Sequence, residues 1–146
     1  MKKSILVIDD DEAVLNSIAK ALRLEGYKVD TAETGKDAIE KCDMRFYNLA
    51  LIDLRLPDME GTQLLKAIRD TTPKMIKIVM TGYPSLQNAI EALNKGADGY
   101  VIKPADIPKL LTMVKEYLQK QEEAGRYSER KFADFIETRA REMEQS

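Results

Sequence analysis

The sequence predicts an α/β domain built on a five-stranded parallel sheet that carries helices on both faces. Short apolar runs alternate five times with segments whose apolar residues recur at helical spacing, and this strand–helix order is typical of parallel sheets. Several runs are continuously apolar, such as "LALI" at residues 49–52, which favours strands buried on both faces. A length of 146 residues suits one such domain with an appendage.

Five runs are expected to form the strands: residues 5–8, 28–32, 49–52, 76–80 and 100–102. The second run alternates apolar and polar residues, whereas the others are mostly apolar. Alternation is typical of a strand that is less deeply buried, so we expect the second strand at an edge of the sheet.

Each strand is expected to lead into a helix, and glycines mark two of the helix ends. Gly26 and Gly96 follow the first and fourth helical segments, where a left-handed residue commonly ends a helix. Thr71-Thr72-Pro73 is expected to end the third. The five apolar stripes are Val14, Leu15, Ile18, Leu22; Ala38, Ile39, Cys42; Leu64, Leu65, Ile68; Leu86, Ala89, Ile90, Leu93; and Ile107, Leu110, Leu111, Val114, Tyr117, Leu118.

Composition excludes several classes of function. The chain has no histidine, which excludes a histidine-based catalytic triad and imidazole ligation of zinc, so any metal must be held by oxygen. Cys42 is the single cysteine, which argues against disulfides and fits a reducing compartment. A net charge of −2 and the lack of a long apolar run predict a cytoplasmic protein that binds neither nucleic acid nor membrane.

Polar residues that could bind a metal or take part in catalysis follow four of the predicted strands. Asp9 and Asp10 follow the first strand, and Asp53 follows the third. Thr81 follows the fourth and Lys103 the fifth. Because functional crevices in such sheets lie beyond the carboxyl ends of the strands, we expect these side chains to converge.

Crowded carboxylates at this point favour a bound divalent cation. Two carboxylates about 4 Å apart repel by roughly 4 kcal/mol at an effective dielectric near 20, and a hard cation with oxygen ligands, such as Mg²⁺, offsets this repulsion. Asp53 is then a candidate nucleophile toward phosphorus, forming an aspartyl phosphate. Lys103 and Thr81 suit the phosphoryl oxygens as a point charge and a hydroxyl donor.

Four motifs in this order, "VIDDDE", "LIDLRLPDMEG", "VMTGYP" and "GYVIKP", resemble the receiver domain of two-component response regulators. The resemblance covers residues 1 to about 120 and implies a doubly wound, flavodoxin-like fold with strand order 2-1-3-4-5. Residues 121–146 are then a helical C-terminal extension. The implied function is a signalling switch that accepts a phosphoryl group from a sensor histidine kinase or phosphotransfer protein and catalyses only its own phosphorylation and dephosphorylation.

The resemblance also implies a role for each site residue. Asp53 is the phosphoacceptor, and Asp9, Asp10, Asp53 and the backbone carbonyl of Arg55 hold Mg²⁺, for which Mn²⁺ can substitute. Thr81 and Lys103 bind the phosphoryl oxygens.

Two further features follow from the resemblance. Tyr100 is the aromatic switch that moves with Thr81, and the Lys103–Pro104 peptide bond is cis.

Three alternatives remain open at this stage. Asp10, Asp11 and Glu12 could cap the first helix, and we assign that role to the last two. The chain could be a receiver that works through binding without phosphate. It could also be a magnesium phosphatase of the haloacid dehalogenase type. Those enzymes carry a second aspartate two residues after the nucleophile, followed by a threonine, and "DDDEA" lacks that threonine.

Two bulky residues lie two positions beyond site residues: Arg55 beyond Asp53 and Tyr83 beyond Thr81. Our hypothesis is that Arg55 and Tyr83 partly cover the phosphoryl group and slow attack by water.

The C-terminal extension is expected to form a separate helix. Gly125 is expected to break the chain's fifth helix and Ser128 to cap the next one. Its apolar face comprises Phe132, Phe135, Ile136, Ala140 and Met143, and we expect that face to dock on the receiver or on a partner chain, with a homodimer as one option. The sequence does not identify the downstream target.

Overall fold

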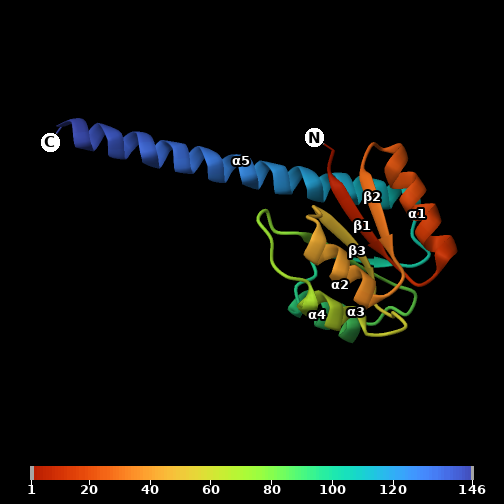
Figure 1. Cartoon of the computed structure of the whole chain (residues 1–146). Helices are drawn as coiled ribbons and strands as arrows, with labels where there is room; N and C mark the ends of the chain where they lie inside the picture. The colour runs from red at the N-terminus through yellow and green to blue at the C-terminus, as the bar shows by residue number, and fades with distance from the viewer. Residues whose placement is uncertain (1, 146) are drawn as a thin grey trace.

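Five parallel strands form one sheet in the order β2-β1-β3-β4-β5 in the computed structural model, which describes residues 2–145 (Figure 1). The strands are β1 (Ser4–Ile8), β2 (Lys28–Ala32), β3 (Leu49–Asp53), β4 (Ile76–Thr81) and β5 (Gly99–Ile102). This is the predicted strand order, and β2 lies at an edge as expected.

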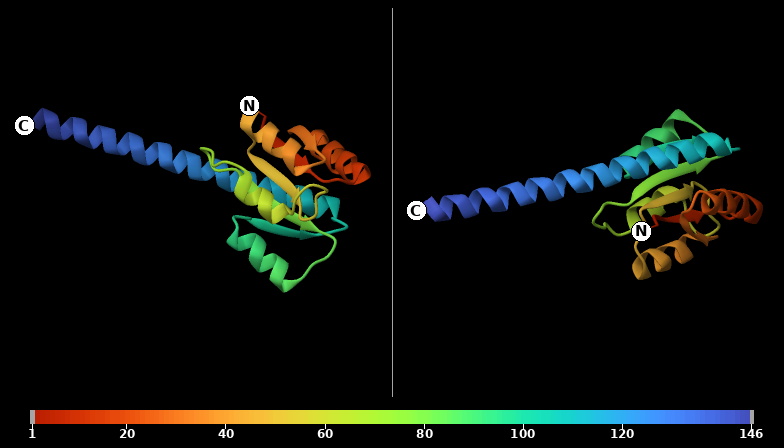
Figure 2. Two further views of the ribbon diagram at one scale, coloured as in Figure 1. Left: turned by 60° about the horizontal axis from the view of Figure 1, so that its bottom comes forward. Right: turned by 90° about the horizontal axis from the view of Figure 1, so that it is seen from above.

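Within residues 2–145, five helices cover the two faces of the sheet (Figure 2). They are α1 (Glu12–Leu24), α2 (Gly35–Met44), α3 (Gly61–Ala67), α4 (Leu86–Asn94) and α5 (Ile107–Gln145). Apolar residues of α1 and α5 pack in one layer of the core, and those of α2, α3 and α4 pack in the other. The predicted doubly wound architecture is therefore confirmed.

The central strands are buried on both sides because neighbouring side chains of a strand point to opposite faces. In β1, Ile5 and Val7 pack with α1 and α5, whereas Leu6 and Ile8 pack with α2, α3 and α4. All four residues are fully buried. The continuous apolar runs in the sequence thus reflect two core layers that share one sheet.

The ends of the helices mostly follow the sequence. Asp11 caps α1, since its carboxylate accepts hydrogen bonds from the backbone N–H groups of Ala13 and Val14 at 3.0 and 3.3 Å. Gly26 and Gly96 have φ values of 94° and 108°, a region that glycine adopts readily. The third helix ends at Ala67, earlier than the expected breaker at residues 71–73. The Lys103–Pro104 peptide bond is cis, as expected, and so is Thr72–Pro73.

Helix α4 turns its large apolar residues away from the sheet. Leu86, Ile90 and Leu93 are 78%, 50% and 53% exposed, whereas Ala92 is fully buried. The predicted stripe therefore exists on the helix, but small residues on another face make the contact with the core. Helical spacing identifies an apolar face and does not reveal whether the sheet or solvent lies opposite it.

The prediction of a break at Gly125 and a cap at Ser128 is wrong, because α5 runs unbroken for 39 residues. Glycine inside a helix costs only about 1 kcal/mol relative to alanine. The Arg126–Glu122 ion pair, 2.7 Å long, spans this position and supports the helix there.

The C-terminal part of α5 projects away from the sheet (Figure 1). Gln121 ties the helix to the body through hydrogen bonds with Asn48 and with the backbone carbonyl of Lys74. Residues 126–145 are exposed, so the expectation that this segment docks on its own receiver is wrong. No helix within residues 2–145 is long and apolar enough to cross a membrane.

Candidate functional site

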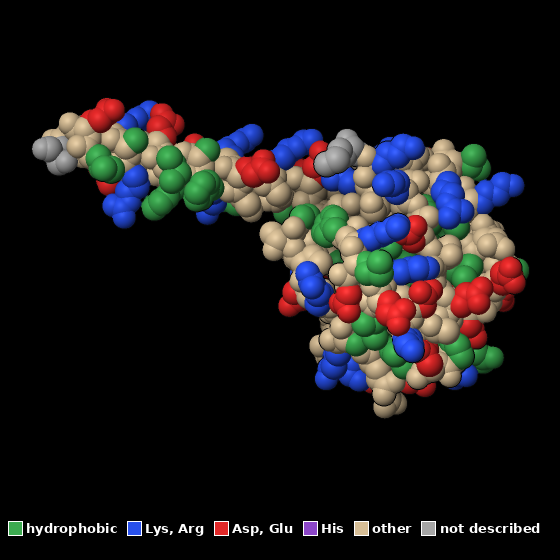
Figure 3. All heavy atoms as spheres, viewed as in Figure 1, with side chains coloured by type: hydrophobic (Ala, Val, Ile, Leu, Met, Phe, Trp, Pro, Cys, Tyr) green, Lys and Arg blue, Asp and Glu red, His purple; other side chains and the backbone are tan. Residues whose placement is uncertain are grey.

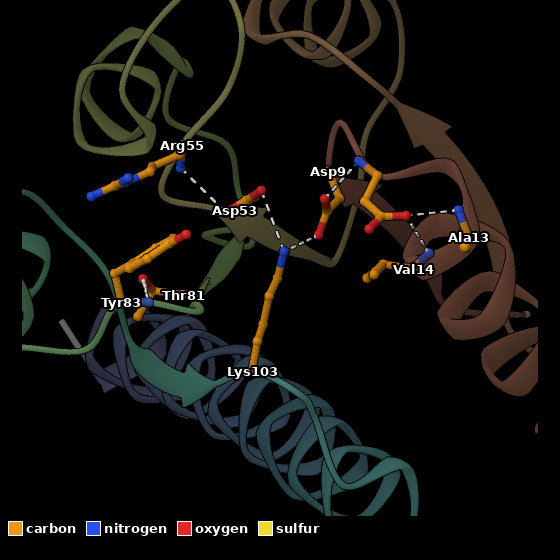
Figure 4. Close-up of polar contacts among 9 residues, drawn as sticks. Asp9, Ala13, Val14, Asp53, Arg55, Thr81, Tyr83 and Lys103 are labelled. Atoms are coloured by element: carbon orange, nitrogen blue, oxygen red, sulfur yellow. Dashed lines mark hydrogen bonds and ion pairs between the residues drawn. The ribbon is translucent and has the colours of Figure 1, made fainter.

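The carboxyl ends of β1, β3 and β5 bring three carboxylates and one ammonium group together. Figure 4 shows three of these residues, Asp9, Asp53 and Lys103. Oxygen atoms from Asp9, Asp10 and Asp53 all lie within 4.8 Å of one another. Asp9 is fully buried and Asp53 is 7% exposed, whereas Asp10 is exposed. The convergence expected for these residues is therefore present in the structure.

Lys103 reaches between the two buried carboxylates. Its Nζ donates a hydrogen bond to Asp9 and lies 3.3 Å from a carboxylate oxygen of Asp53. The lysine side chain is 19% exposed, so solvent screens these pairs only in part. The ammonium group thus offsets much of the repulsion between the two aspartates.

Burial dominates the electrostatics of Asp53. Loss of solvent raises the pKa of this carboxyl to about 6, against an ordinary value of 3.8. A hydrogen bond from the backbone N–H of Arg55, 3.2 Å long, opposes the shift. The charge of Asp9 raises the pKa further, and the charge of Lys103 lowers it.

The pKa of Lys103 is raised in turn. Burial alone would lower it, but the hydrogen bond to Asp9 and the charges of Asp53 and Asp9 outweigh that effect. Lysine is therefore protonated at neutral pH and remains a fixed positive charge in the site.

The residues of this cluster fit a divalent metal ion. All the available ligand atoms are oxygens, and three carboxylates from two strand ends reach one small volume. Hard cations such as Mg²⁺ and Ca²⁺ take oxygen ligands of this kind. The acidic cluster can therefore hold a divalent cation between Asp9, Asp10 and Asp53.

Thr81 and Tyr83 border the site from the end of β4. The Thr81 hydroxyl oxygen accepts a hydrogen bond from the backbone N–H of Tyr83 at 3.0 Å. The backbone N–H of Lys103 donates to the Thr81 carbonyl at 2.7 Å, which links the ends of β4 and β5. Arg55 stacks on the Tyr83 ring, so the two predicted covering residues contact each other (Figure 4).

Tyr100 lies in β5 and packs against the core layer of α2, α3 and α4. Its hydroxyl oxygen is buried and makes no hydrogen bond within residues 2–145. A buried hydroxyl without a partner costs about 1–3 kcal/mol, so a donor or acceptor that reached this oxygen would recover part of that cost.

Two residues that position the site were missed by sequence reasoning. The Asp58 carboxylate accepts hydrogen bonds from the backbone N–H groups of Gly35 and Lys36 at 2.8 and 2.9 Å, which ties the loop after β3 to the start of α2. Gly61 lies against the backbone at Asp53 and Leu54. The one sequence signal for these two residues is "PDMEG", whose Pro, Asp and Gly are typical of a turn.

Comparison with known proteins agrees with this geometry. The family model described as response regulator receiver domain matches residues 5–115. The transcriptional regulatory protein ZraR of Klebsiella oxytoca is 40% identical over 114 residues, covering 78% of this chain and 26% of that protein. The acid tolerance regulatory protein ActR of Rhizobium meliloti (strain 1021) is 39% identical over 109 residues, covering 75% of this chain and 56% of that protein.

The chain thus spans about a quarter of ZraR and just over half of ActR. Among solved structures, a CheY-like response regulator receiver domain protein from Methanospirillum hungatei JF-1 has a TM-score of 0.81 and 46% identity, covering 85% of this chain and 99% of that one. A response regulator from Burkholderia pseudomallei, solved with a phosphorylated aspartic acid, a calcium ion and citrate, has a TM-score of 0.73 and 29% identity, covering 85% and 73%. With its five-stranded sheet, its acidic cluster and a family match over most of its length, the chain belongs to the response regulator receiver domain family.

Proposed function

We propose that Asp53 of this receiver accepts a phosphoryl group from a phosphohistidine of a sensor kinase or phosphotransfer protein. A carboxylate oxygen of Asp53 would form a bond to phosphorus while the bond from phosphorus to the imidazole nitrogen breaks, and the electron pair would leave with the imidazole. The observation that supports this most is the meeting of Asp53 with Lys103 and two further aspartates at the carboxyl end of the sheet.

Positioning and charge neutralisation supply most of the catalysis in phosphoryl transfer. Lys103 lies 3.3 Å from Asp53 and is charged at neutral pH, so it would bind a phosphoryl oxygen once Asp53 is esterified. Thr81 would donate its hydroxyl to another oxygen after releasing the N–H of Tyr83. The product is a modified receiver, so the chain would catalyse only its own phosphorylation and dephosphorylation.

Mg²⁺ is the cofactor that we assign to the acidic cluster, and Mn²⁺ could substitute. Asp9, Asp10 and Asp53 would hold it together with the backbone carbonyl of Arg55. Mg²⁺ commonly joins one or two carboxylates to a phosphate and neutralises charge on the phosphoryl oxygens. A related receiver with a phosphorylated aspartate was solved with calcium, which supports an oxygen-ligated divalent ion at such sites.

The switch would run from Thr81 to Tyr100. Thr81 ends β4, and Tyr100 lies in the adjacent strand β5. The Tyr100 hydroxyl is buried and makes no hydrogen bond among residues 2–145. Movement of Thr81 toward a phosphoryl group would change the packing of this ring. The exposed apolar residues of α4 are Leu86, Ile90 and Leu93. They would form the surface that a protein target binds after the switch.

Mass spectrometry after incubation with acetyl phosphate and Mg²⁺ tests the reaction class. We expect the mass of one phosphoryl group to be added to the wild-type protein, and nothing to be added to Asp53→Asn or to wild type in EDTA. Asp134→Asn is a matched control, because this acid lies on the exposed part of α5. Uptake by Asp53→Asn at the wild-type level would contradict the assignment, and absence of uptake by wild type would favour a receiver that works without phosphate.

A further inference from the structure

The loop that joins β3 to α3 doubles back on itself before the helix begins. Arg55 pairs with Glu60 as an isolated antiparallel bridge. One step further out, the backbone N–H of Leu56 donates a hydrogen bond to the carbonyl of Met59 at 3.2 Å. The loop is therefore a narrow hairpin, and Asp58 lies at its tip.

The base of this hairpin belongs to the candidate site. The backbone N–H of Arg55 donates to the Asp53 carboxylate at 3.2 Å, and the Arg55 carbonyl is the group assigned above to the divalent cation. Mg²⁺ demands near-ideal octahedral geometry, so a carbonyl ligand must be held in a narrow range of positions. Loops hold functional groups less precisely than helices and strands do. The backbone at Arg55 therefore needs an anchor.

The tip of the hairpin is anchored to the first turn of α2. One carboxylate oxygen of Asp58 accepts a hydrogen bond from the backbone N–H of Gly35 at 2.8 Å, and the other accepts from Lys36 at 2.9 Å. These two hydrogen bonds lower the pKa of Asp58, so both oxygens are acceptors at neutral pH. The first N–H groups of a helix have no partner within the helix, and Asp58 supplies one for each of these two.

Two side chains share the capping of α2. Thr34 precedes the helix, and its hydroxyl oxygen accepts a hydrogen bond from the backbone N–H of Asp37 at 3.0 Å. Asp58 instead reaches the helix from a loop 22 and 23 residues further along the chain. Of these two caps, Asp58 is the one that links the helix to the candidate site.

Packing beside Asp58 leaves the hairpin little freedom. A Cβ atom at Gly35 would lie 2.4 Å from the sulfur of Met59, so this methionine packs directly on the first residue of α2. Met59 and Leu56 also pack against the core layer of α2, α3 and α4. One turn further along α2, Ala38 is fully buried in that layer. The hairpin is thus attached to a part of the helix that the core holds in place.

We infer that Asp58 is a positioning residue for the divalent cation: it holds the hairpin on α2 and so holds the backbone of Arg55 against the acidic cluster. This inference rests on the proposed assignment of Mg²⁺ to that cluster. Asp58 is not assigned as a ligand and acts through the loop backbone. Because coupling between two sites is reciprocal, cation binding should in turn stabilise the first turn of α2.

Titration of the full chain with Mn²⁺, followed by the EPR signal of the free ion, gives the first test, and competition then gives the affinity for Mg²⁺. We expect Asp58→Ala to bind the cation about tenfold more weakly than wild type, the low end for loss of a group that orients metal ligands. Thr34→Ala is the matched control, because it removes the other cap of the same helix end and leaves the hairpin anchored. Its affinity should stay within about twofold of wild type. Equal affinities for Asp58→Ala and wild type, or equal losses in the two variants, would overturn the inference.

The charge of Asp58 must be separated from its hydrogen bonds. Figure 3 shows acidic side chains on the face of the molecule where α2 begins, and such charges attract a cation without positioning anything. Asp58→Asn removes the charge but keeps one acceptor oxygen for one of the two N–H groups. Half of the free-energy effect corresponds to a loss of about threefold, between wild type and Asp58→Ala. Equal losses in the two Asp58 variants would show that charge alone acts, and would contradict the inference.

Hydrogen exchange measured by NMR tests the reciprocal effect. Saturating Mg²⁺ should slow exchange of the Gly35 and Lys36 amides in wild type by up to the same factor of about ten. In Asp58→Ala the same addition should leave their exchange unchanged. Exchange that does not respond to Mg²⁺ in wild type would contradict the coupling.

Phosphoryl uptake from acetyl phosphate, measured in parallel, separates this inference from the proposed function. At saturating Mg²⁺ the uptake rate of Asp58→Ala should approach that of wild type, because the cation site is then filled. Uptake by neither protein, together with the difference in cation affinity, would contradict the proposed function and support the inference. Normal uptake with equal affinities would do the reverse, and absence of cation binding by wild type would contradict both.

Discussion

The guanidinium carbon of Arg55 lies 4.2 Å from the centre of the Tyr83 ring, which joins the loop after β3 to the loop after β4. Arg55 also donates its backbone N–H to Asp53, and Tyr83 donates its own to Thr81. Each member of this pair is thus bonded to a different residue of the candidate site (Figure 4). Our hypothesis is that these stacked side chains cover a phosphoryl group on Asp53 and slow attack by water.

Removal of this cover should shorten the lifetime of the phosphorylated protein. A cation–π contact of this kind contributes about 0.5–1 kcal/mol, so we expect Arg55→Ala and Tyr83→Ala each to speed phosphate loss about two- to fivefold. Because the two side chains act together, the double variant should lose phosphate more slowly than the product of the single effects predicts. Phosphate release after removal of the phosphodonor measures this; an unchanged or longer lifetime in the double variant contradicts the hypothesis.

Replacement of Lys103 by methionine should destabilise the metal-free protein. The substitution leaves Asp9 fully buried beside Asp53 without the ammonium group that now pairs with both. Loss of one partner from a buried charge pair costs about 3 kcal/mol or more. Urea unfolding in EDTA measures this loss, and Mg²⁺ should restore part of it by binding the folded state.

Lys95→Met is the control for this experiment. Lys95 pairs with Glu91 at 2.7 Å on α4, at a more exposed position, and a surface pair of this kind is worth less than about 1 kcal/mol. Equal losses in the two variants would show that Lys103 does not neutralise a buried acidic pair.

Asp53→Asn should stabilise the metal-free protein at neutral pH. The pKa of Asp53 is raised from 3.8 to about 6 in the folded state, mainly by burial, so the ionised carboxylate opposes folding above that pH. The two pKa values correspond to a gain of about 3 kcal/mol for the neutral amide near pH 7.5. This gain should shrink as the pH falls below about 6 and vanish below about pH 3, where the acid is protonated in both states.

Thermal unfolding of wild type and Asp53→Asn across this pH range, in EDTA, measures whether the substitution stabilises or destabilises the protein. A variant that is less stable than wild type at neutral pH would mean that the ion pair with Lys103 outweighs the burial of Asp53. Asp134→Asn, on the exposed part of α5, should show no such pH-dependent gain.

Most of the fold and the centre of the site could be predicted because the physical constraints on them are local. Apolar runs such as residues 49–52 are buried on both faces, and parallel pairing then forces the following residues to one edge of the sheet. Asp9, Asp53 and Lys103 could therefore be brought together from strand positions alone.

Other features depend on contacts that spacing does not encode. The apolar stripe of α4 is periodic, yet it faces solvent because Ala92 makes the contact with the core. A glycine such as Gly125 commonly ends a helix, yet α5 continues through it. The Arg126–Glu122 ion pair supports the helix across this position. The hydrogen bonds of Asp58 join segments 22 and 23 residues apart, so their partner could not be chosen without the fold.

Gly61 shows how closely the backbone is packed beneath the site. A Cβ atom at this position would lie 2.5 Å from the carbonyl oxygen of Asp53 and 2.8 Å from the Cα of Leu54. Its backbone N–H donates a short hydrogen bond to the Leu54 carbonyl at 2.7 Å. Both close neighbours are backbone atoms, which cannot rotate away, so a side chain here must displace the end of β3.

Gly61→Ala should therefore impair both stability and phosphorylation. We expect a loss of about 1–3 kcal/mol in the free energy of unfolding, which is typical of overpacking, and slower phosphoryl uptake because Asp53 moves relative to Lys103. Gly125→Ala is the matched control: a Cβ there meets nothing within 4 Å, so the helix should gain up to about 1 kcal/mol and uptake should not change. Urea unfolding and mass spectrometry of the phosphorylated protein measure the two effects, and normal uptake by Gly61→Ala would show that the site tolerates a shift of the β3 backbone.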